Sequence, residues 1–131
     1  MIGLIWLIQV VHYPLFAKVG SEGFQEYSQD HQRLITRIVL PLMFMELGTS
    51  LYLVFSRPTG VSSWLAFIGA TLVAVIWLST FLIQVPQHGQ LLEKLDPVVC
   101  AQLVQGNWIR TISWSLRGLI TGWMVWIVMR G

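Results

Sequence analysis

Charged residues are scarce in this chain of 131 residues: they make up 11% of it, whereas hydrophobic residues make up 55%. A soluble domain of this length carries about 25% charged residues. The formal net charge of +2 is too small to indicate a nucleic-acid partner, and no basic patch with interleaved aromatic residues supports one. The composition therefore disfavours a soluble domain and predicts a protein embedded in a lipid bilayer.

Cysteine is almost absent. The single Cys100 excludes an internal disulfide and a CxxC redox pair, which argues against four-helix quinone reductases that work through pairs of cysteines. A lone cysteine of this kind is expected to be a buried packing residue. Long polar tails, low-complexity runs and fixed-period repeats are also missing, so the length predicts one domain over residues 1–131.

The N-terminal segment lacks two marks of a signal peptide, a basic start and a cleavage site of small residues. It also carries Gln9, His12 and Pro14 where a signal peptide is plainly apolar. We therefore expect a retained helix, and its abrupt start suggests a start codon further upstream.

Four mostly apolar segments come close to the roughly 20 residues that a helix needs to cross the hydrocarbon core. They cover residues 2–17, which is short, then 34–55, 63–85 and 107–129. Helices are the expected spanning form because lipid cannot pair backbone polar groups. Four spans with short links predict an all-α integral membrane four-helix bundle that runs up, down, up and down.

The two longer links, residues 18–32 and 86–106, are then expected on one side of the membrane, opposite both termini. Both could form short helices at the surface. The Lys and Arg residues assigned to this side are Lys18, Arg33, Arg37, Lys94 and Arg110, against Arg57 and Arg130 on the other side. The positive-inside rule favours the cytoplasm for these links, in a plasma or inner membrane.

Ionisable residues within the predicted spans are candidates for function, because they are costly in hydrocarbon and usually face the bundle interior. Glu46 and Arg117 lie at nearly matching depths in the second and fourth spans. We expect them to form a pair that neutralises both charges. Such a pair either belongs to a site or only orients the helices.

The fourth span carries a polar stripe with steps of three or four residues, which places it on one helix face. Its members are Asn107, Arg110, Trp114, Arg117 and Thr121. This face cannot point to lipid, so it lines either a polar cavity or a hydrogen-bonded seam. Two arginines exceed what one deep acid can pair, which favours the cavity.

The third span ends with Thr80, Gln84 and His88 on one face, and Pro86 interrupts the helix there. Proline removes a backbone hydrogen bond, so we expect a kink that turns Gln84 and His88 inward. Pro14 is expected to produce a similar break in the first span.

His12, His31 and His88 all lie toward the side of the longer links. With Glu46 they are the candidate metal ligands, because imidazole and carboxylate suit iron, zinc or copper. No HxxxH, HExxH or ExxH pair supports a metal or haem, however, so no cofactor is firmly implied. Histidines that hydrogen-bond or act as general acid or base fit better. His31, at a span entrance, is expected in a surface or cap role.

Two segments carry a family pattern. Residues 84–88 read Gln-Val-Pro-Gln-His and are followed by Leu91 and Leu92, and residues 107–111 read Asn-Trp-Ile-Arg-Thr. They resemble the anthrone-oxygenase-like family of small four-helix membrane proteins, which shows an Asn-Val-Pro-x-Asn turn after its third span and an Asn-x-x-Arg-Thr start to its fourth. Gln84 and His88 stand where asparagines are usual, and Gly106 stands in place of a usual tryptophan.

The resemblance implies an oxygenase-type site for a flat, apolar aromatic or quinone-like molecule, and it transfers Asn107 and Arg110 directly. A base would remove a proton from the substrate, and cationic and amide groups would hold the resulting oxyanion. The predicted catalytic residues are His12, His88, Asn107 and Arg110, and the predicted substrate-binding residues are Glu46, Gln84, Trp114 and Arg117.

Three functions stay open at this point. The first is an oxygenase or oxidoreductase that abstracts a proton from a lipophilic substrate. The second is a metal- or haem-binding redox protein. The third is a non-catalytic membrane subunit or small-ligand binder whose polar seam only fixes helix packing. The expected partners are the bilayer and a lipophilic small molecule. A homo-oligomer also stays open. A transporter is less expected, because a transport path through four helices without broken repeats would need an oligomer.

Overall fold

The computed structural model describes residues 1–131, and all of its regular structure is helical. The helices are α1 (Ile2–Leu7), α2 (Tyr13–Phe16), α3 (Phe24–Phe55), α4 (Ser63–Ser79), α5 (Val85–Glu93) and α6 (Pro97–Arg130), with π-helical segments η1 (Ile8–His12) and η2 (Thr80–Gln84). Because η1 joins α1 to α2 and η2 joins α4 to α5 without a break, the chain forms four rods. We call α1–η1–α2 the first rod and α4–η2–α5 the third rod.

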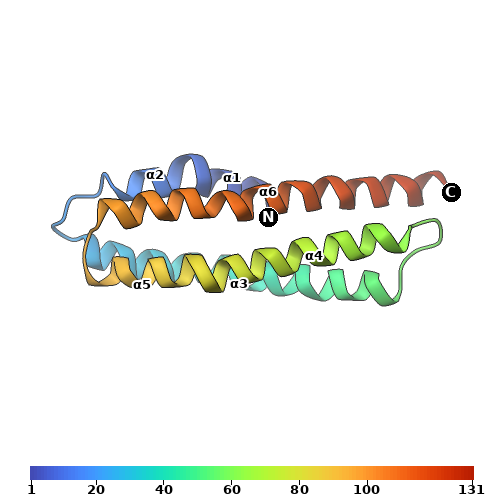
Figure 1. Cartoon of the computed structure of the whole chain (residues 1–131), viewed down its shortest axis with the longest axis horizontal. Coiled ribbons are helices and arrows are strands. Elements are labelled where there is room, and N and C mark those ends of the chain that lie inside the picture. The colour runs from blue at the N-terminus through green and yellow to red at the C-terminus, as the bar shows by residue number, and fades with distance from the viewer.

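The four rods lie side by side and run in alternating directions along one long axis (Figure 1). The turns before α3 and before α6 lie at one end, which we call the loop end. The link between α3 and α4 and the C-terminus lie at the other end. The first rod is only about 22 Å long at 1.5 Å per residue, so it covers about half of α6, and the N-terminus lies near the middle of the molecule.

The long helices begin earlier than hydropathy predicts. α3 starts at Phe24, after Gly23 with its positive φ of 80°. α6 starts at Pro97, because the Asp96 side chain accepts hydrogen bonds from the backbone N–H groups of Val98 and Val99. An Asp cap followed by a proline is a strong helix start. Residues 18–32 and 86–106 therefore do not form the separate surface helices that were expected. Most of them belong to the first turns of α3 and α6 and to the end of the third rod.

Two of the prolines follow π-helical turns and do not end their helices. The backbone N–H of Tyr13, before Pro14, donates to the carbonyl of Ile8. The N–H of Val85, before Pro86, donates to the carbonyl of Thr80. These bonds span five residues, whereas an α-helix spans four. The proline ring lacks an N–H and would crowd the preceding turn of an α-helix, and the wider π turn makes room for it. The helix therefore continues through a π segment at both positions where a break was expected.

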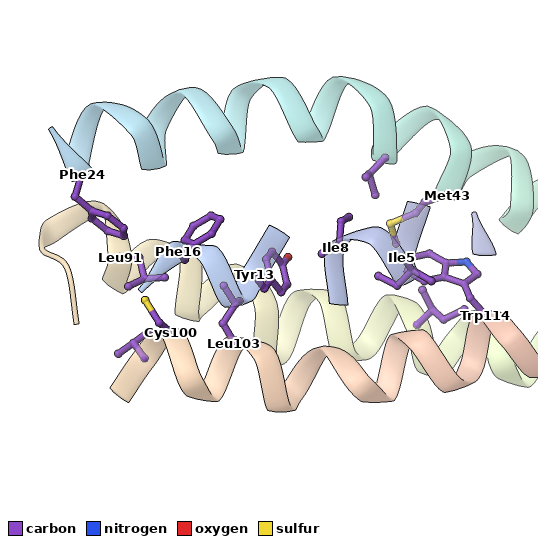
Figure 2. Packing of buried hydrophobic residues seen from close by; sticks show 13 residues of the cluster. Ile5, Ile8, Tyr13, Phe16, Phe24, Met43, Leu91, Cys100, Leu103 and Trp114 are labelled. Carbon is purple, nitrogen blue, oxygen red and sulfur yellow. The ribbon is translucent and has the colours of Figure 1, made fainter. Parts of the chain in front are cut away.

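α6 is the central rod of the bundle. The first rod packs on one side of it and the third rod on another, and α3 packs against the third rod. The backbones of the first rod and α3 stay apart. Aromatic side chains fill this fourth side: the Phe16 ring contacts those of Phe24, Tyr27 and His31, with centroids 6.3, 5.4 and 4.9 Å away. The main buried cluster extends from Phe24 at the loop end to Trp114 near the middle (Figure 2).

Three helical segments are long and apolar enough to cross a membrane by length and composition, namely Phe24–Phe55, Ser63–Glu93 and Pro97–Arg130. The first rod is apolar but shorter. Many large hydrophobic side chains are exposed on the outside of the bundle, among them Phe55, Trp64, Leu82, Leu119 and Met129. Apolar surface of this extent marks contact with lipid or with another protein. Cys100 is buried and free, as expected for a packing residue.

Candidate functional site

A cavity of about 330 Å³ lies between α3 and the third rod, and we call it the central cavity. Nine of its 14 lining residues are hydrophobic. The other five are Thr36, Thr80, Gln84, His88 and Arg110, and Tyr13, which is one of the nine, adds a hydroxyl group. Side chains from all four rods thus meet in one apolar space that contains a few polar groups, which is the usual composition of a small-molecule site.

The third rod supplies the largest share of the polar wall. Thr80, Gln84 and His88 all line the cavity, so the face predicted from their spacing is a shared face in the structure. The Thr80 hydroxyl donates to the carbonyl of Ile76 at 2.7 Å and is already satisfied. α3 is held against this part of the rod by Gln32, whose amide donates to the His88 carbonyl at 3.0 Å.

Gln84 is buried in the cavity wall with 2% of its surface exposed, and neither its amide oxygen nor its amide nitrogen has a hydrogen-bond partner. Buried amides in native proteins are nearly always paired. Gly106 on α6 is the reason that this side chain fits: a Cβ there would lie 2.8 Å from Ile83 and 3.2 Å from the Gln84 nitrogen. The amide is therefore unpaired in the wall of the central cavity.

Arg110 is 5% exposed and also lines the cavity. Its Nε is buried without a partner, and the two ion pairs in the structure involve other arginines. The guanidinium carbon lies 5.1 Å from the centre of the Trp114 ring, which gives a cation–π contact. A buried cation without an acid partner is costly. An anionic group in the cavity would offset that cost.

Tyr13 was not singled out from the sequence, yet it joins the cavity residues. Its hydroxyl lies 3.1 Å from His88 Nε2 and close to the Arg110 side chain. The residue is buried at the junction of η1 and α2 (Figure 2). Tyr13 directly precedes Pro14, just as Val85 directly precedes Pro86. This repeated arrangement is the sequence signal that could have identified Tyr13 as a residue of the site.

His31 is buried, with 8% of its surface exposed, so the expected surface or cap role is wrong. The reason is that α3 begins at Phe24, which puts His31 inside the helix on the side facing the first rod. His31 Nδ1 lies 2.8 Å from His12 Nε2, within hydrogen-bond distance. His12 does not line the central cavity.

Glu46 lies far from the histidines, about 22 Å further along α3 than His31 at 1.5 Å per residue. No group of three or more His, Cys, Asp or Glu side chains is arranged to hold a metal ion. The four-residue metal set of His12, His31, Glu46 and His88 is thus not assembled, because three members lie near the loop end and one near the middle.

Glu46 and Arg117 do lie together, as their matching depths predict. Arg117 Nη1 is 3.9 Å from Glu46 Oε1, and Arg117 Nη2 donates to the Glu46 carbonyl at 3.3 Å. The shorter contact is to Trp114, whose indole N–H donates to Glu46 Oε2 at 2.5 Å. None of the three residues lines the central cavity. Their predicted role in substrate binding stays a prediction, and the geometry is that of an interhelical ion pair.

Asn107 is completely buried and belongs to a seam between the first rod and α6. Its amide nitrogen donates to Gln9 Oε1 at 2.9 Å, and the Thr111 hydroxyl donates to the same oxygen at 3.1 Å. Gln9 in turn donates to the Val104 carbonyl at 3.0 Å. The stripe predicted on the fourth span is therefore divided between the seam, the cavity and the Glu46 pair, while Thr121 at its end is exposed.

Comparison with known proteins gives no match to a family model, to a curated protein or to a solved structure. The resemblance to the anthrone-oxygenase-like family therefore rests on residues 84–92 and 107–111 and stays a prediction.

Proposed function

We propose that the chain spans a bilayer as a four-helix bundle, in a plasma or inner membrane with the loop end in the cytoplasm. Three helices of spanning length and an apolar exterior support this placement. The first rod, at about 22 Å, is shorter than the hydrocarbon core of about 30 Å. A short span of this kind is accommodated by local thinning of the bilayer.

The central cavity, in this proposal, binds a flat lipophilic molecule with an oxygen that carries or develops negative charge. Its volume of about 330 Å³ falls within the usual range of about 300–1,000 Å³ for ligand pockets. The observation that carries the proposal is the buried Arg110, which has no acid partner and faces this cavity beside the unpaired amide of Gln84. An oxyanion would accept hydrogen bonds from the Arg110 Nε and from the Gln84 amide nitrogen.

Oxygenation of an anthrone-like ketone is the reaction that these residues fit best. His88 removes a proton from the methylene group opposite the carbonyl, and the electron pair moves to the carbonyl oxygen, which Arg110 and Gln84 hold as an enolate. The enolate carbon bonds to O₂, and the peroxide formed takes up one proton. Loss of water from the hydroperoxide leaves a second carbonyl, so ketone and O₂ give quinone and water.

The test uses the purified protein in phospholipid nanodiscs, with anthrone as the probe and both oxygen uptake and quinone absorbance as readouts. We expect uptake above that of empty nanodiscs, and a loss of about 100-fold or more in His88→Gln, because general-base catalysis contributes about 10²–10⁴. Gln90→Ala, an exposed change one half-turn away on α5, is the control and should leave the rate unaltered. Equal rates with and without protein would overturn the enzymatic proposal.

A non-catalytic ligand binder is the second candidate, and one observation favours it over the metal-based alternative. The unpaired Arg110 Nε and Gln84 amide would be satisfied by a bound polar group whether or not a reaction follows. Binding of the probe without oxygen uptake would assign this function.

A further inference from the structure

A second cavity, of about 460 Å³, lies between the first rod and α3. It opens on the side of the bundle where these two backbones stay apart. Eight of its 11 lining residues are hydrophobic, and the titratable ones are His12, Tyr27, Asp30 and His31. Ile8 and Ile35 line both cavities, so the two spaces are neighbours.

Three histidine rings connect the two cavities, one on each of three rods. His88 lines the central cavity, whereas His31 and His12 line the second cavity. The ring centroids are 5.5 Å apart between His88 and His31, and 4.5 Å apart between His31 and His12. His31 Nε2 and His88 Nδ1 are both buried without partners, while the other nitrogen of each ring is hydrogen-bonded. The two free nitrogens therefore remain available for proton transfer.

A proton held on His88 would be badly placed for the proposed reaction. The ring would carry a positive charge near Arg110, and no carboxylate lines the central cavity to compensate. The second cavity differs, because it contains the Asp30 carboxylate and opens to the outside of the bundle. Moving the positive charge from His88 to His12 increases its distance from Arg110. The Arg110 guanidinium then interacts with the enolate without a second positive charge beside it.

We infer that His31 and His12 form a proton-transfer path from His88 to the second cavity. They act as positioning residues for the proton and do not touch the substrate. His88 gives its proton to His31 Nε2 through a ring rotation or one bridging water. His31 releases the proton on Nδ1 to His12 Nε2 and becomes the other neutral tautomer, and His12 passes a proton to water. The inference rests on the proton abstraction proposed above.

Hydrogen exchange at the anthrone methylene, followed by NMR in D₂O without oxygen, tests this path. Exchange requires that the abstracted proton leaves for solvent, whereas oxygen uptake requires only that it is abstracted. We expect the wild-type protein to accelerate exchange. In His12→Ala and in His31→Gln the ratio of exchange to oxygen uptake should fall by about tenfold or more. Free imidazole, which fits the space vacated beside the second cavity, should restore the ratio in His12→Ala.

The matched control is Val11→Ala, which enlarges the same cavity without removing a titratable group and should keep the wild-type ratio. A wild-type ratio in both histidine variants, with exchange and uptake intact, would overturn the path and leave the proposed reaction standing. If the wild-type protein accelerates neither process, the proposed function fails and the path with it.

Discussion

Arg110 and Gln84 were both found from sequence, because a charged or amide side chain in an apolar span usually faces the interior. What the sequence could not provide was which buried polar residues are already satisfied. Asn107 and Arg110 are one turn apart on α6, yet the amide nitrogen of Asn107 is bonded to Gln9 whereas the Nε of Arg110 has no hydrogen-bond partner. The difference depends on where the first rod lies, and spacing along α6 does not contain that information.

His31 and Tyr13 illustrate the opposite error, in which a residue that belongs to the site was given a minor role or overlooked. His31 was placed at a span entrance because hydropathy begins to rise only after it. The Tyr13 side chain is largely apolar, so its sequence position does not distinguish it from a packing residue. Both assignments depend on the side chains that fill the gap between the first rod and α3, and such long-range contacts are not visible in one sequence.

The Glu46–Arg117 pair allows a prediction at the scale of single residues. Glu46→Leu alone should destabilise the protein more than the double change Glu46→Leu with Arg117→Leu, because the single change leaves a partly buried cation unpaired. We expect a coupling free energy of about 1–3 kcal/mol. Thermal unfolding in detergent measures it. Trp114→Phe is the control for the lost indole hydrogen bond, and strict additivity of the two changes would contradict the pairing.

At the scale of elements, hydropathy predicted the four helical rods but not where two of them begin. The start of α6 was readable from Asp96 and Pro97, a cap and a first-turn proline that were read as part of a link. The π segments were not predictable in this way. A proline requires some local adjustment, and only the packing of the neighbouring rods decides whether the helix bends, ends or widens.

The contact between α6 and η2 allows a prediction for an element. Gly106→Ala should lower stability by about 1–3 kcal/mol, because the new Cβ would lie 2.8 Å from the branched side chain of Ile83. Gly48→Ala is the matched control within α3, where a Cβ has no neighbour within 4 Å and the change should be neutral or stabilising. Melting temperatures in detergent compare the two, and an equal effect would show that η2 is not packed against α6 in this way.

At the scale of the whole molecule, the bundle is closed on three sides by backbone packing, whereas the fourth side holds aromatic side chains near the loop end and contains the second cavity. Both cavities adjoin α3, the rod whose backbone packs only against the third rod. This arrangement gives a lipophilic molecule a route from the bilayer between rods. It also explains why three histidines from three rods can meet near the loop end.

The membrane placement predicts which ends are accessible from each side of a cell. After Cys100→Ala, a cysteine introduced at Lys94 should be protected from an impermeant maleimide added outside, whereas one at Thr59 should react. The reason is that these links lie at opposite ends of the bundle and the excess of Lys and Arg is at the loop end. Permeabilised cells provide the control, in which both should react. Labelling of both in intact cells would contradict a spanning bundle.

Equilibrium binding tests the central claim, an anion held by Arg110 in the central cavity, most directly. The probes are an anionic hydroxyanthraquinone and its neutral parent anthraquinone, titrated into the protein in nanodiscs and followed by absorbance. The account predicts that the wild-type protein prefers the anion by about tenfold or more. Arg110→Met should abolish this preference, and the exposed change Arg37→Met should keep it. An unaltered preference in Arg110→Met would contradict the account.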